Sequence, residues 1–237
     1  MGVAETFSDP VRGINAYAEV AEQLGGVLAF LARNHPETLF TLGGDCSVEL
    51  APVSYLNTRY PDFGVVWFDA HADLQAPATT PSGDLHGMPL RLLFGEGEKG
   101  LKGLLPSFLR PEQVILAGVR ALDSVEEEVI ARLGLDGLSA DEITGQPGLI
   151  AERARRFGWR HVYLHIDLDV LGVEAFSSLG WPESGGLTVA SLVAALGELH
   201  REFNVVGGGL TEYLPTAGDA EHADAAVALT VLDAWLG

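Results

Sequence analysis

Residues 63–73 of this 237-residue chain read FGVVWFDAHAD, and this stretch decides the fold. Its first six residues are apolar or glycine, without alternation, which is typical of a strand buried on both faces of a parallel sheet. Three candidate ligand side chains follow at every second position: Asp69, His71 and Asp73. If the backbone stays extended there, all three face the same side. The stretch therefore predicts a buried strand that delivers polar groups at its carboxyl end.

Similar apolar runs alternate with helical patterns along the chain. We expect the other strands at 38–42, 113–119, 161–166 and 204–210. We expect helices, several with a Ser, Thr or Asp start residue, at 14–33, 47–58, 124–133, 148–157, 188–201 and 219–235. Alternating strands and helices are typical of right-handed βαβ units. The prediction is a single α/β domain over residues 1–237, a three-layer αβα fold with a mostly parallel sheet and long loops at 74–89 and 171–187.

The composition is strongly acidic, with 33 Asp+Glu against 14 Lys+Arg and a formal net charge of -19. This leaves no basic surface for nucleic acid or for anionic membranes, so neither is an expected partner. The one cysteine, Cys46, can form no internal disulfide, and the first ten residues lack the pattern of a signal peptide. We therefore expect a soluble, cytoplasmic protein. The acidic excess suits either a solvated surface or a cation site, and composition alone leaves both open.

The residues that follow the expected strands favour a cation site. GGDCS, with Cys46, follows the first strand, DLD, with Asp167 and Asp169, follows the fourth, and Glu212 follows the fifth. Because the carboxyl ends of parallel strands meet at one edge of a sheet, these groups should converge with those of DAHAD. Clustered carboxylates repel one another and are costly to bury without a cation. The pattern predicts one or two hard divalent metals, and two metals about 3.5–4 Å apart could share a nucleophilic hydroxide.

These motifs resemble those of the arginase–agmatinase (ureohydrolase) family over roughly residues 40–216. GGDCS resembles the family's GGDHS, DAHAD matches its DAHxD, and HIDLD resembles its SxDxD. The resemblance implies an arginase-like fold with a dinuclear manganese centre at the carboxyl edge of the sheet. It also implies hydrolysis of a C–N bond in a small cationic guanidino substrate, with release of urea.

The resemblance further implies a role for each matching residue. The metal ligands would be Asp69 and Asp167 as bridges, His71 and Asp169 at one ion, and Asp73 and Cys46 at the other. His86, within SGDLHGMP, would shuttle protons, and Glu212 would face the substrate guanidinium. The contacts to an amino-acid substrate would come from Gln75 and Ser82 at its α-carboxylate and Asp123 at its α-amino group. We count His86, Asp73 and Glu212 as the catalytic residues.

Some positions depart from the family pattern. Cys46 stands where the family has a ligand histidine, so we expect two divalent ions, Mn²⁺ first, with Zn²⁺, Fe²⁺, Co²⁺ or Ni²⁺ as alternatives. His165 replaces a serine, and we interpret it as a buried strand histidine, not as a ligand. The strand and glycine-rich turn that precede the first long helix in the family are expected to be missing or reduced. The remaining histidines are interpreted as surface residues: His35, His161, His200 and His222.

Three classes of function stay open at this point. The leading prediction is a hydrolase of L-arginine, because Gln75, Ser82 and Asp123 resemble an amino-acid clamp; agmatine, guanidinobutyrate, guanidinopropionate and formiminoglutamate are the alternative substrates. The second is a catalytically weak or silent family member that binds metal or a partner, suggested by Cys46. The third is a deacetylase-like amidohydrolase with one zinc ion, against which DAHAD and Glu212 argue. A homo-oligomer is also left open, since the sequence shows no interface pattern.

Overall fold

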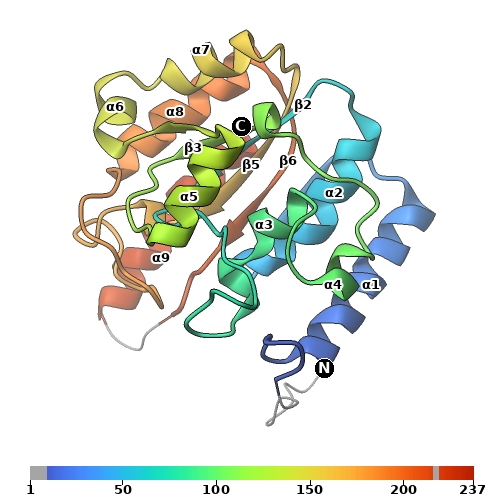
Figure 1. The fold of residues 1–237 in the computed structure, drawn as a ribbon. Helices are drawn as coiled ribbons and strands as arrows, with labels where there is room; N and C mark the ends of the chain where they lie inside the picture. The colour runs from blue at the N-terminus through green and yellow to red at the C-terminus, as the bar shows by residue number, and fades with distance from the viewer. Residues whose placement is uncertain (1–9, 216–218) are drawn as a thin grey trace.

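The computed structural model describes residues 10–215 and 219–237, without the side chains of 219–222. Its centre is a six-stranded parallel sheet in the order β1-β6-β5-β2-β3-β4 (Figure 1). The strands are β1 (Leu39–Leu42), β2 (Phe63–Phe68), β3 (Val114–Ala117), β4 (Asp136–Leu138), β5 (His161–Asp167) and β6 (Asn204–Thr211). The predicted parallel α/β sheet is confirmed. The strands that precede the acidic motifs, β2 and β5, are neighbours in its middle.

Helices connect the strands. The longer ones are α1 (Tyr17–Asn34), α2 (Leu50–Arg59), α5 (Ser124–Leu133), α7 (Leu149–Arg156), α8 (Val189–Glu202) and α9 (Asp219–Leu236). The short ones are α3 (Pro89–Leu93), α4 (Lys99–Lys102), α6 (Ala140–Gly145) and the 3₁₀ turns η1 (Cys46–Glu49), η2 (Leu85–Gly87), η3 (Pro111–Gln113) and η4 (Leu168–Val170). Throughout the described parts of the chain, every helix falls short of the apolar length that crossing a bilayer requires.

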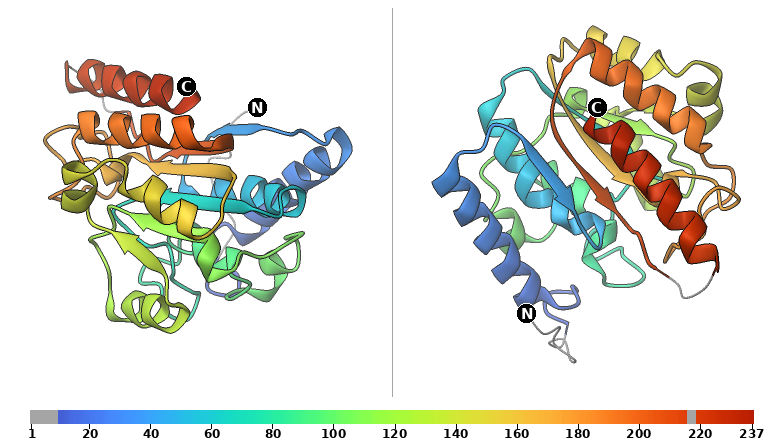
Figure 2. Two further views of the ribbon diagram at one scale, coloured as in Figure 1. Left: turned by 90° about the horizontal axis from the view of Figure 1, so that it is seen from above. Right: turned by 180° about the vertical axis from the view of Figure 1, so that it is seen from behind.

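Each face of the sheet carries its own hydrophobic core, and the alternation of side chains along β2 shows how. Val65 and Trp67 pack with residues of α1, α2 and α3, whereas Val66 and Phe68 pack with α7, α8 and α9. Figure 2 shows the α8–α9 layer against one face of the sheet and α1 and α2 on the other side. The strands β2, β3 and β5 are buried on both faces, which explains why they read as continuous apolar runs.

Several predicted boundaries differ from the structure by one to three residues, and two of them have a clear local reason. The strand expected at 113–119 ends at Ala117, because Gly118 has a φ of 90° and turns the chain away from the sheet. The helix expected from residue 47 begins as a 3₁₀ turn at Cys46, where the Asp45 carboxylate accepts a hydrogen bond from the Ser47 N–H at 2.8 Å. The edge strand β4 and helix α6 were not predicted, since the sequence of β4, Asp-Gly-Leu, has none of the features of a strand.

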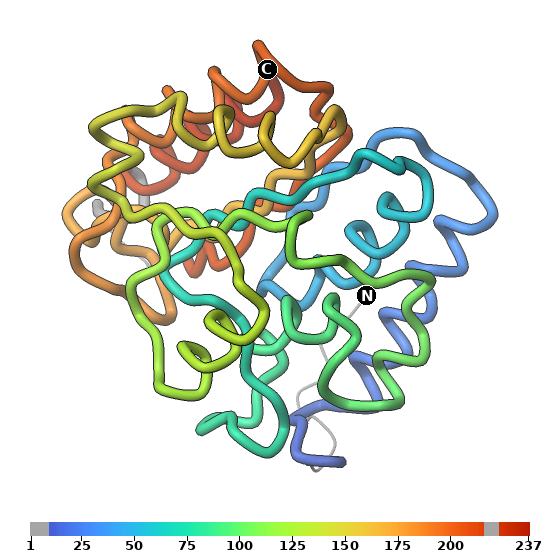
Figure 3. Tube along the Cα trace, turned by 45° about the horizontal axis from the view of Figure 1, so that its top comes forward, coloured from blue at the N-terminus to red at the C-terminus, as the bar shows by residue number. Residues whose placement is uncertain are grey.

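The loop at 74–89 lies at the carboxyl edge of the sheet and is fixed at both sides. The Gln75 N–H donates to the Gly87 carbonyl at 2.9 Å, which closes the base of the loop. The Asn15 N–H donates to the Gly83 carbonyl at 2.9 Å, and the Asn15 side-chain amide donates to Asp84 at 2.8 Å. In Figure 3 this loop passes beside the segment that leads into α1. The loop therefore has a defined position above the strand ends.

Candidate metal centre and substrate pocket

The predicted convergence of the strand ends is present in the structure. Asp69 follows β2, Asp167 ends β5, Cys46 begins the turn after β1, and Glu212 follows β6. These four strands are consecutive in the sheet, so their carboxyl ends lie side by side. Whether the converging groups bind metal stays a prediction.

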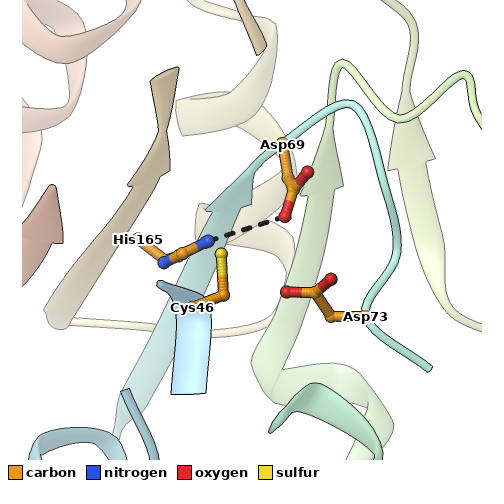
Figure 4. A group of neighbouring side chains, drawn as sticks. All are labelled: Cys46, Asp69, Asp73 and His165. Carbon is orange, nitrogen blue, oxygen red and sulfur yellow. Dashed lines mark ion pairs between the residues drawn. The ribbon is translucent and has the colours of Figure 1, made fainter. Parts of the chain in front are cut away.

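Three overlapping groups of ligand atoms lie there, each with all its atoms within 4.8 Å of one another. The members are Asp69, His71 and Asp169 in one, Cys46, Asp69, Asp73 and His165 in the second, and Cys46, Asp167 and Glu212 in the third. Figure 4 shows the second group, whose side chains point toward a common space from the turn after β1, the loop after β2 and strand β5. Asp69 belongs to two groups, as a residue between two ions would.

The group around His71 is held by short polar contacts. His71 Nδ1 lies 2.9 Å from Asp169 Oδ2 and 3.5 Å from Asp69 Oδ1. The Ala70 N–H donates to Asp169 Oδ1 at 2.9 Å, and the Asp169 N–H donates to Asp167 Oδ1 at 2.8 Å. The acidic side chains are therefore oriented by backbone donors of the loops that carry them. Two carboxylates and one imidazole suit a divalent cation of the first transition row.

Cys46 lies on the other side of the cluster, and its side chain is buried. Its Sγ is 3.1 Å from Asp167 Oδ2 and 3.4 Å from Thr211 Oγ1. Burial raises the pKa of the Cys46 thiol well above its ordinary value, and the charges of Asp167 and Asp73 raise it further. Without a cation the thiol is thus protonated at neutral pH and donates to Asp167.

The backbone departs from the extended form that the sequence predicts for residues 69–73. Asp73 has a φ of 54°, in the left-handed region, so the backbone is not extended at this residue. This turn separates His71 and Asp73 into different groups of ligand atoms, instead of placing them on one side. Glu212 also has a positive φ, 62°. Left-handed backbone costs an ordinary residue about 1–2 kcal/mol, and such strain concentrates at functional sites.

The electrostatics of the cluster show a deficit of positive charge. Burial raises the pKa of both Asp73 and Asp167 well above the usual value, and the Asp69 charge adds to it. Burial opposes ionisation of Asp69 too, but His165 and His71 outweigh it and lower its pKa. For His71, burial lowers the pKa, but contacts with Asp169 and Asp69 raise it to about 12. The buried carboxylates thus compete for two imidazoles.

Unsatisfied polar atoms indicate that a cation belongs in this cluster. Several buried side-chain atoms of the described residues have no hydrogen-bond partner. They include Asp73 Oδ2, Glu212 Oε1 and both ring nitrogens of His165. Buried polar atoms normally find a partner, and buried carboxylates in particular are paired or coordinate a metal. The donor set of carboxylate, imidazole and thiol residues therefore suits one or two divalent ions.

A cavity of about 220 Å³ opens from this cluster. It is lined by His71, Asp73, Gln75, Thr80, Pro81, Ser82, His86, Gly87, Asp123, Glu126, Asp167, Asp169, Trp181 and Glu212. All predicted substrate-binding residues and His86 are among them. His86 Nδ1 lies 3.8 Å from Glu212 Oε1, and the Gln75 side-chain amide donates to the Asp123 carboxylate. Burial, with the charge of Asp45 next in effect, raises the pKa of Glu212 to about 7.

Among the lining residues that the sequence analysis did not single out, Glu126 and Trp181 make notable contacts. Glu126 is buried and accepts a hydrogen bond from the Leu74 N–H at 3.2 Å; its position in a run of three glutamates at a helix start concealed it. Trp181 comes from the loop at 171–187 and stacks on His86, with ring centroids 6.0 Å apart. A lone tryptophan in a long glycine-containing loop was the available signal for it.

The histidines outside the cluster have varied surroundings. His35 is exposed, as predicted. His161 and His200 were also expected at the surface but are half-buried: His161 pairs with Asp62 at 2.5 Å, and His200 with the Trp235 carbonyl at 2.9 Å. Each histidine is partly covered by a residue that is distant in the sequence, so its burial could not be predicted. The side chain of His222 lies outside the described residues.

Known proteins resemble this chain in both sequence and fold. The model of the arginase family matches residues 8–237. The arginase of Staphylococcus aureus (strain MRSA252) is 33% identical over 226 residues, covering 92% of this chain and 74% of that protein. The Bacillus caldovelox arginase structure has a TM-score of 0.85 at 27% identity, and the Entamoeba histolytica arginase in complex with L-ornithine has 0.88 at 23%; each covers 100% of this chain and 82% of the other. This chain therefore belongs to the arginase family, whose arginases hydrolyse C–N bonds of linear amidines.

Proposed function

We propose that this protein is a binuclear metal-dependent hydrolase that releases urea from a guanidino substrate, with L-arginine as that substrate. The observation that carries the proposal is the lining of the cavity, which combines carboxylates of the ligand cluster and Glu212 with Gln75, Ser82 and Asp123. A guanidinium at Glu212 would leave an α-amino and an α-carboxylate group for Gln75, Ser82 and Asp123.

Divalent cations, when bound, lower the pKa of water and supply a hydroxide nucleophile at neutral pH. We propose Mn²⁺ for the group of Asp69, His71 and Asp169, since it is dominated by carboxylate oxygens. Asp69 and Asp167 would lie between the two ions, and Cys46 and Asp73 would hold the second. Substrate binding and proton transfer would be carried out by side chains of the protein.

Glu212 would bind and orient the substrate guanidinium. Its Oε1 is free of hydrogen bonds to the described residues, and its side chain lines the cavity. A carboxylate accepts paired hydrogen bonds from a planar guanidinium, and the charge on both groups strengthens them. The ionised form of Glu212 is thus the one that binds substrate.

His86 would transfer the proton that the leaving amine requires. It lies beside Glu212, and the stacked Trp181 ring limits how its imidazole can turn. An imidazole is suited to this transfer because its ordinary pKa is near neutral pH. The loop that carries His86 is fixed by Gln75 and Asn15, which keeps the ring over the strand ends.

The test compares L-arginine with guanidinobutyrate, which lacks the α-amino group. Asp123 caps α5, and its Oδ1 accepts the N–H groups of Val125 and Glu126 at 2.9 Å, so its Oδ2 points toward Gln75 and the cavity. For Asp123→Ala we expect kcat/KM for arginine to fall about 100-fold, with a much smaller loss for guanidinobutyrate. Asp141→Ala, at the exposed start of α6, is the control.

Equal losses on the two substrates would overturn the assignment of arginine. Agmatine, guanidinobutyrate, guanidinopropionate and formiminoglutamate would then be compared for the preferred substrate. If the protein binds its full complement of metal but releases neither urea nor formamide from any of these substrates, it is better explained as a catalytically silent member of the family that binds metal.

A further inference from the structure

We propose that His165 is a metal ligand, paired with Cys46 and held in place by Glu49, and that it makes the second metal position selective for Zn²⁺ or Co²⁺ over Mn²⁺. This inference rests on the proposed metal centre and specifies its chemistry. Neither His165 nor Glu49 is among the ligands that the sequence motifs imply.

His165 is completely buried and points into the cluster. Its Nε2 lies 3.6 Å from Asp69 Oδ2, on the side of the ring that faces Cys46 and Asp73 (Figure 4). Its ring stacks on Trp67, with centroids 3.7 Å apart, so the plane of the imidazole is fixed by packing. The four ligand atoms of Cys46, Asp69, Asp73 and His165 all lie within 4.8 Å of one another, close enough to surround one ion.

Glu49 occupies the other side of the same ring. It is fully buried, and its Oε1 lies 3.4 Å from His165 Nδ1. Gly209 of β6 leaves the space for it, since a Cβ there would come 1.4 Å from that oxygen. Glu49 and Asp69 therefore lie at opposite nitrogens of one imidazole. A histidine that binds a metal through one nitrogen commonly donates its other N–H to a carboxylate, which sets the tautomer and strengthens the ligand.

A purely structural ion triad explains these contacts less well. If a protonated His165 served only to join Glu49 and Asp69, hydrogen bonds of about 2.7–3.2 Å would be expected. The distances are 3.4 and 3.6 Å, so neither ring nitrogen has a hydrogen bond of normal length, and the Tyr163 side chain is a further polar neighbour of Glu49. His165 Nε2, which faces the cluster, therefore lacks a close partner in a fully buried position. An ion between His165 Nε2, Cys46 and the carboxylates would supply it.

The ligand types then differ between the two metal positions. A thiolate, an imidazole and two carboxylates are a mixed S, N and O set, typical of Zn²⁺ and Co²⁺. The position of His71 has one imidazole with carboxylates and suits Mn²⁺. Binding at the second position would displace the Cys46 proton to solvent, because only the thiolate is a ligand.

Titration of Co²⁺ into the metal-free protein tests this proposal without any activity assay. We expect a sulfur-to-cobalt charge-transfer band in the near ultraviolet and the intense visible bands of a low-coordinate site. Cys46→Ser should abolish the charge-transfer band. His165→Asn should change the visible bands and weaken Zn²⁺ binding, and Glu49→Gln should weaken it by about 10–100-fold. His161→Asn, on the same strand but paired with Asp62, should leave both unchanged.

X-ray absorption spectroscopy of the zinc-loaded, unmodified protein tests the proposal without any variant, so it does not depend on whether a variant folds. We expect one sulfur at about 2.3 Å and a shell of nitrogen and oxygen with imidazole scattering at about 2.0–2.1 Å. Zinc without a sulfur neighbour, or unaltered cobalt bands and zinc affinity in His165→Asn, would overturn the proposal. Urea release is measured separately: a Mn²⁺-loaded enzyme that makes urea but shows no metal–sulfur bond retains the proposed function and refutes this inference.

Discussion

At the scale of single residues, Asp73 shows how the site lowers the stability of the metal-free protein. The side chain is 4% exposed, its φ is 54°, and its Oδ2 lacks a hydrogen bond to any described residue. Burial and the neighbouring Asp69 raise its pKa well above 3.8. Because its pKa is higher in the folded than in the unfolded state, this group increasingly destabilises the metal-free protein as pH rises above the unfolded value.

We therefore expect Asp73→Asn to stabilise the metal-free protein and to remove its response to metal. At neutral pH the variant should gain about 1–3 kcal/mol in unfolding free energy without metal, since it removes an uncompensated buried charge. The unmodified protein should gain stability when Mn²⁺ or Zn²⁺ is added, and the variant should gain far less. Thermal melts with and without metal measure both effects, with Asp141→Asn as a surface control. A metal-free variant less stable than the unmodified protein would contradict this account.

The residues of the site were predictable from sequence to different degrees. Asp69, Asp167 and Glu212 could be found because each directly follows a strand with a continuous apolar run. Glu49 could not, because its burial depends on the space above Gly209, which belongs to a strand 160 positions later in the chain. Glu126 looked like an ordinary acidic residue of a helix start, which it also is.

At the scale of elements, strands with strong patterns were predicted well and short edge elements were not. β2 spans the predicted residues, and β5 extends one residue past its prediction. β4 has three residues and pairs only with β3, so its existence depends on the neighbouring strand more than on its own sequence. The turn at Asp73 was missed for a similar reason: the fold stabilises a backbone conformation that the alternating DAHAD motif does not indicate.

Helix α4 provides a test of how one element is anchored. The Glu98 carboxylate accepts hydrogen bonds from the Leu101 N–H at 2.8 Å, the Arg12 guanidinium at 2.7 Å and the Tyr17 hydroxyl at 3.0 Å. Burial alone would raise the pKa of Glu98, but the backbone N–H groups of Gly100 and Leu101, with Arg12, outweigh it and lower the pKa from 4.5 to about 2. The carboxylate thus joins α4 to the segment before α1.

We expect Glu98→Gln to lower the unfolding free energy by about 1–2 kcal/mol near neutral pH. Because the pKa of Glu98 is lower in the folded state, its contribution is full above pH 4.5 and is lost as pH falls toward about 2. The difference between variant and unmodified protein should therefore shrink across that window. Denaturant unfolding at several pH values measures it, and Glu112→Gln, half-exposed beside Arg110, should have little effect. A difference that is constant with pH would be inconsistent with this explanation.

At the scale of the whole molecule, the net charge of -19 divides into two parts. Asp69, Asp73, Asp167 and Asp169 lie in the cluster at the carboxyl edge of the sheet, and Glu212 lies beside them. Most of the other carboxylates that the structure describes are exposed or half-buried, where they attract cations. The fold places these carboxylates at the ends of three consecutive strands, β6, β5 and β2, and this arrangement makes a metal centre the consistent explanation of the buried part.

The central claim is that metal bound at this edge makes the protein a guanidino hydrolase. It is tested most directly by titrating Mn²⁺, with and without one equivalent of Zn²⁺, into the metal-free protein while measuring urea release from L-arginine. We predict no urea without metal, a plateau once about two ions are bound per chain, and loss of turnover in Asp69→Asn. Urea release that is unchanged by complete metal removal would contradict the claim, as would two bound ions without urea from any guanidino substrate.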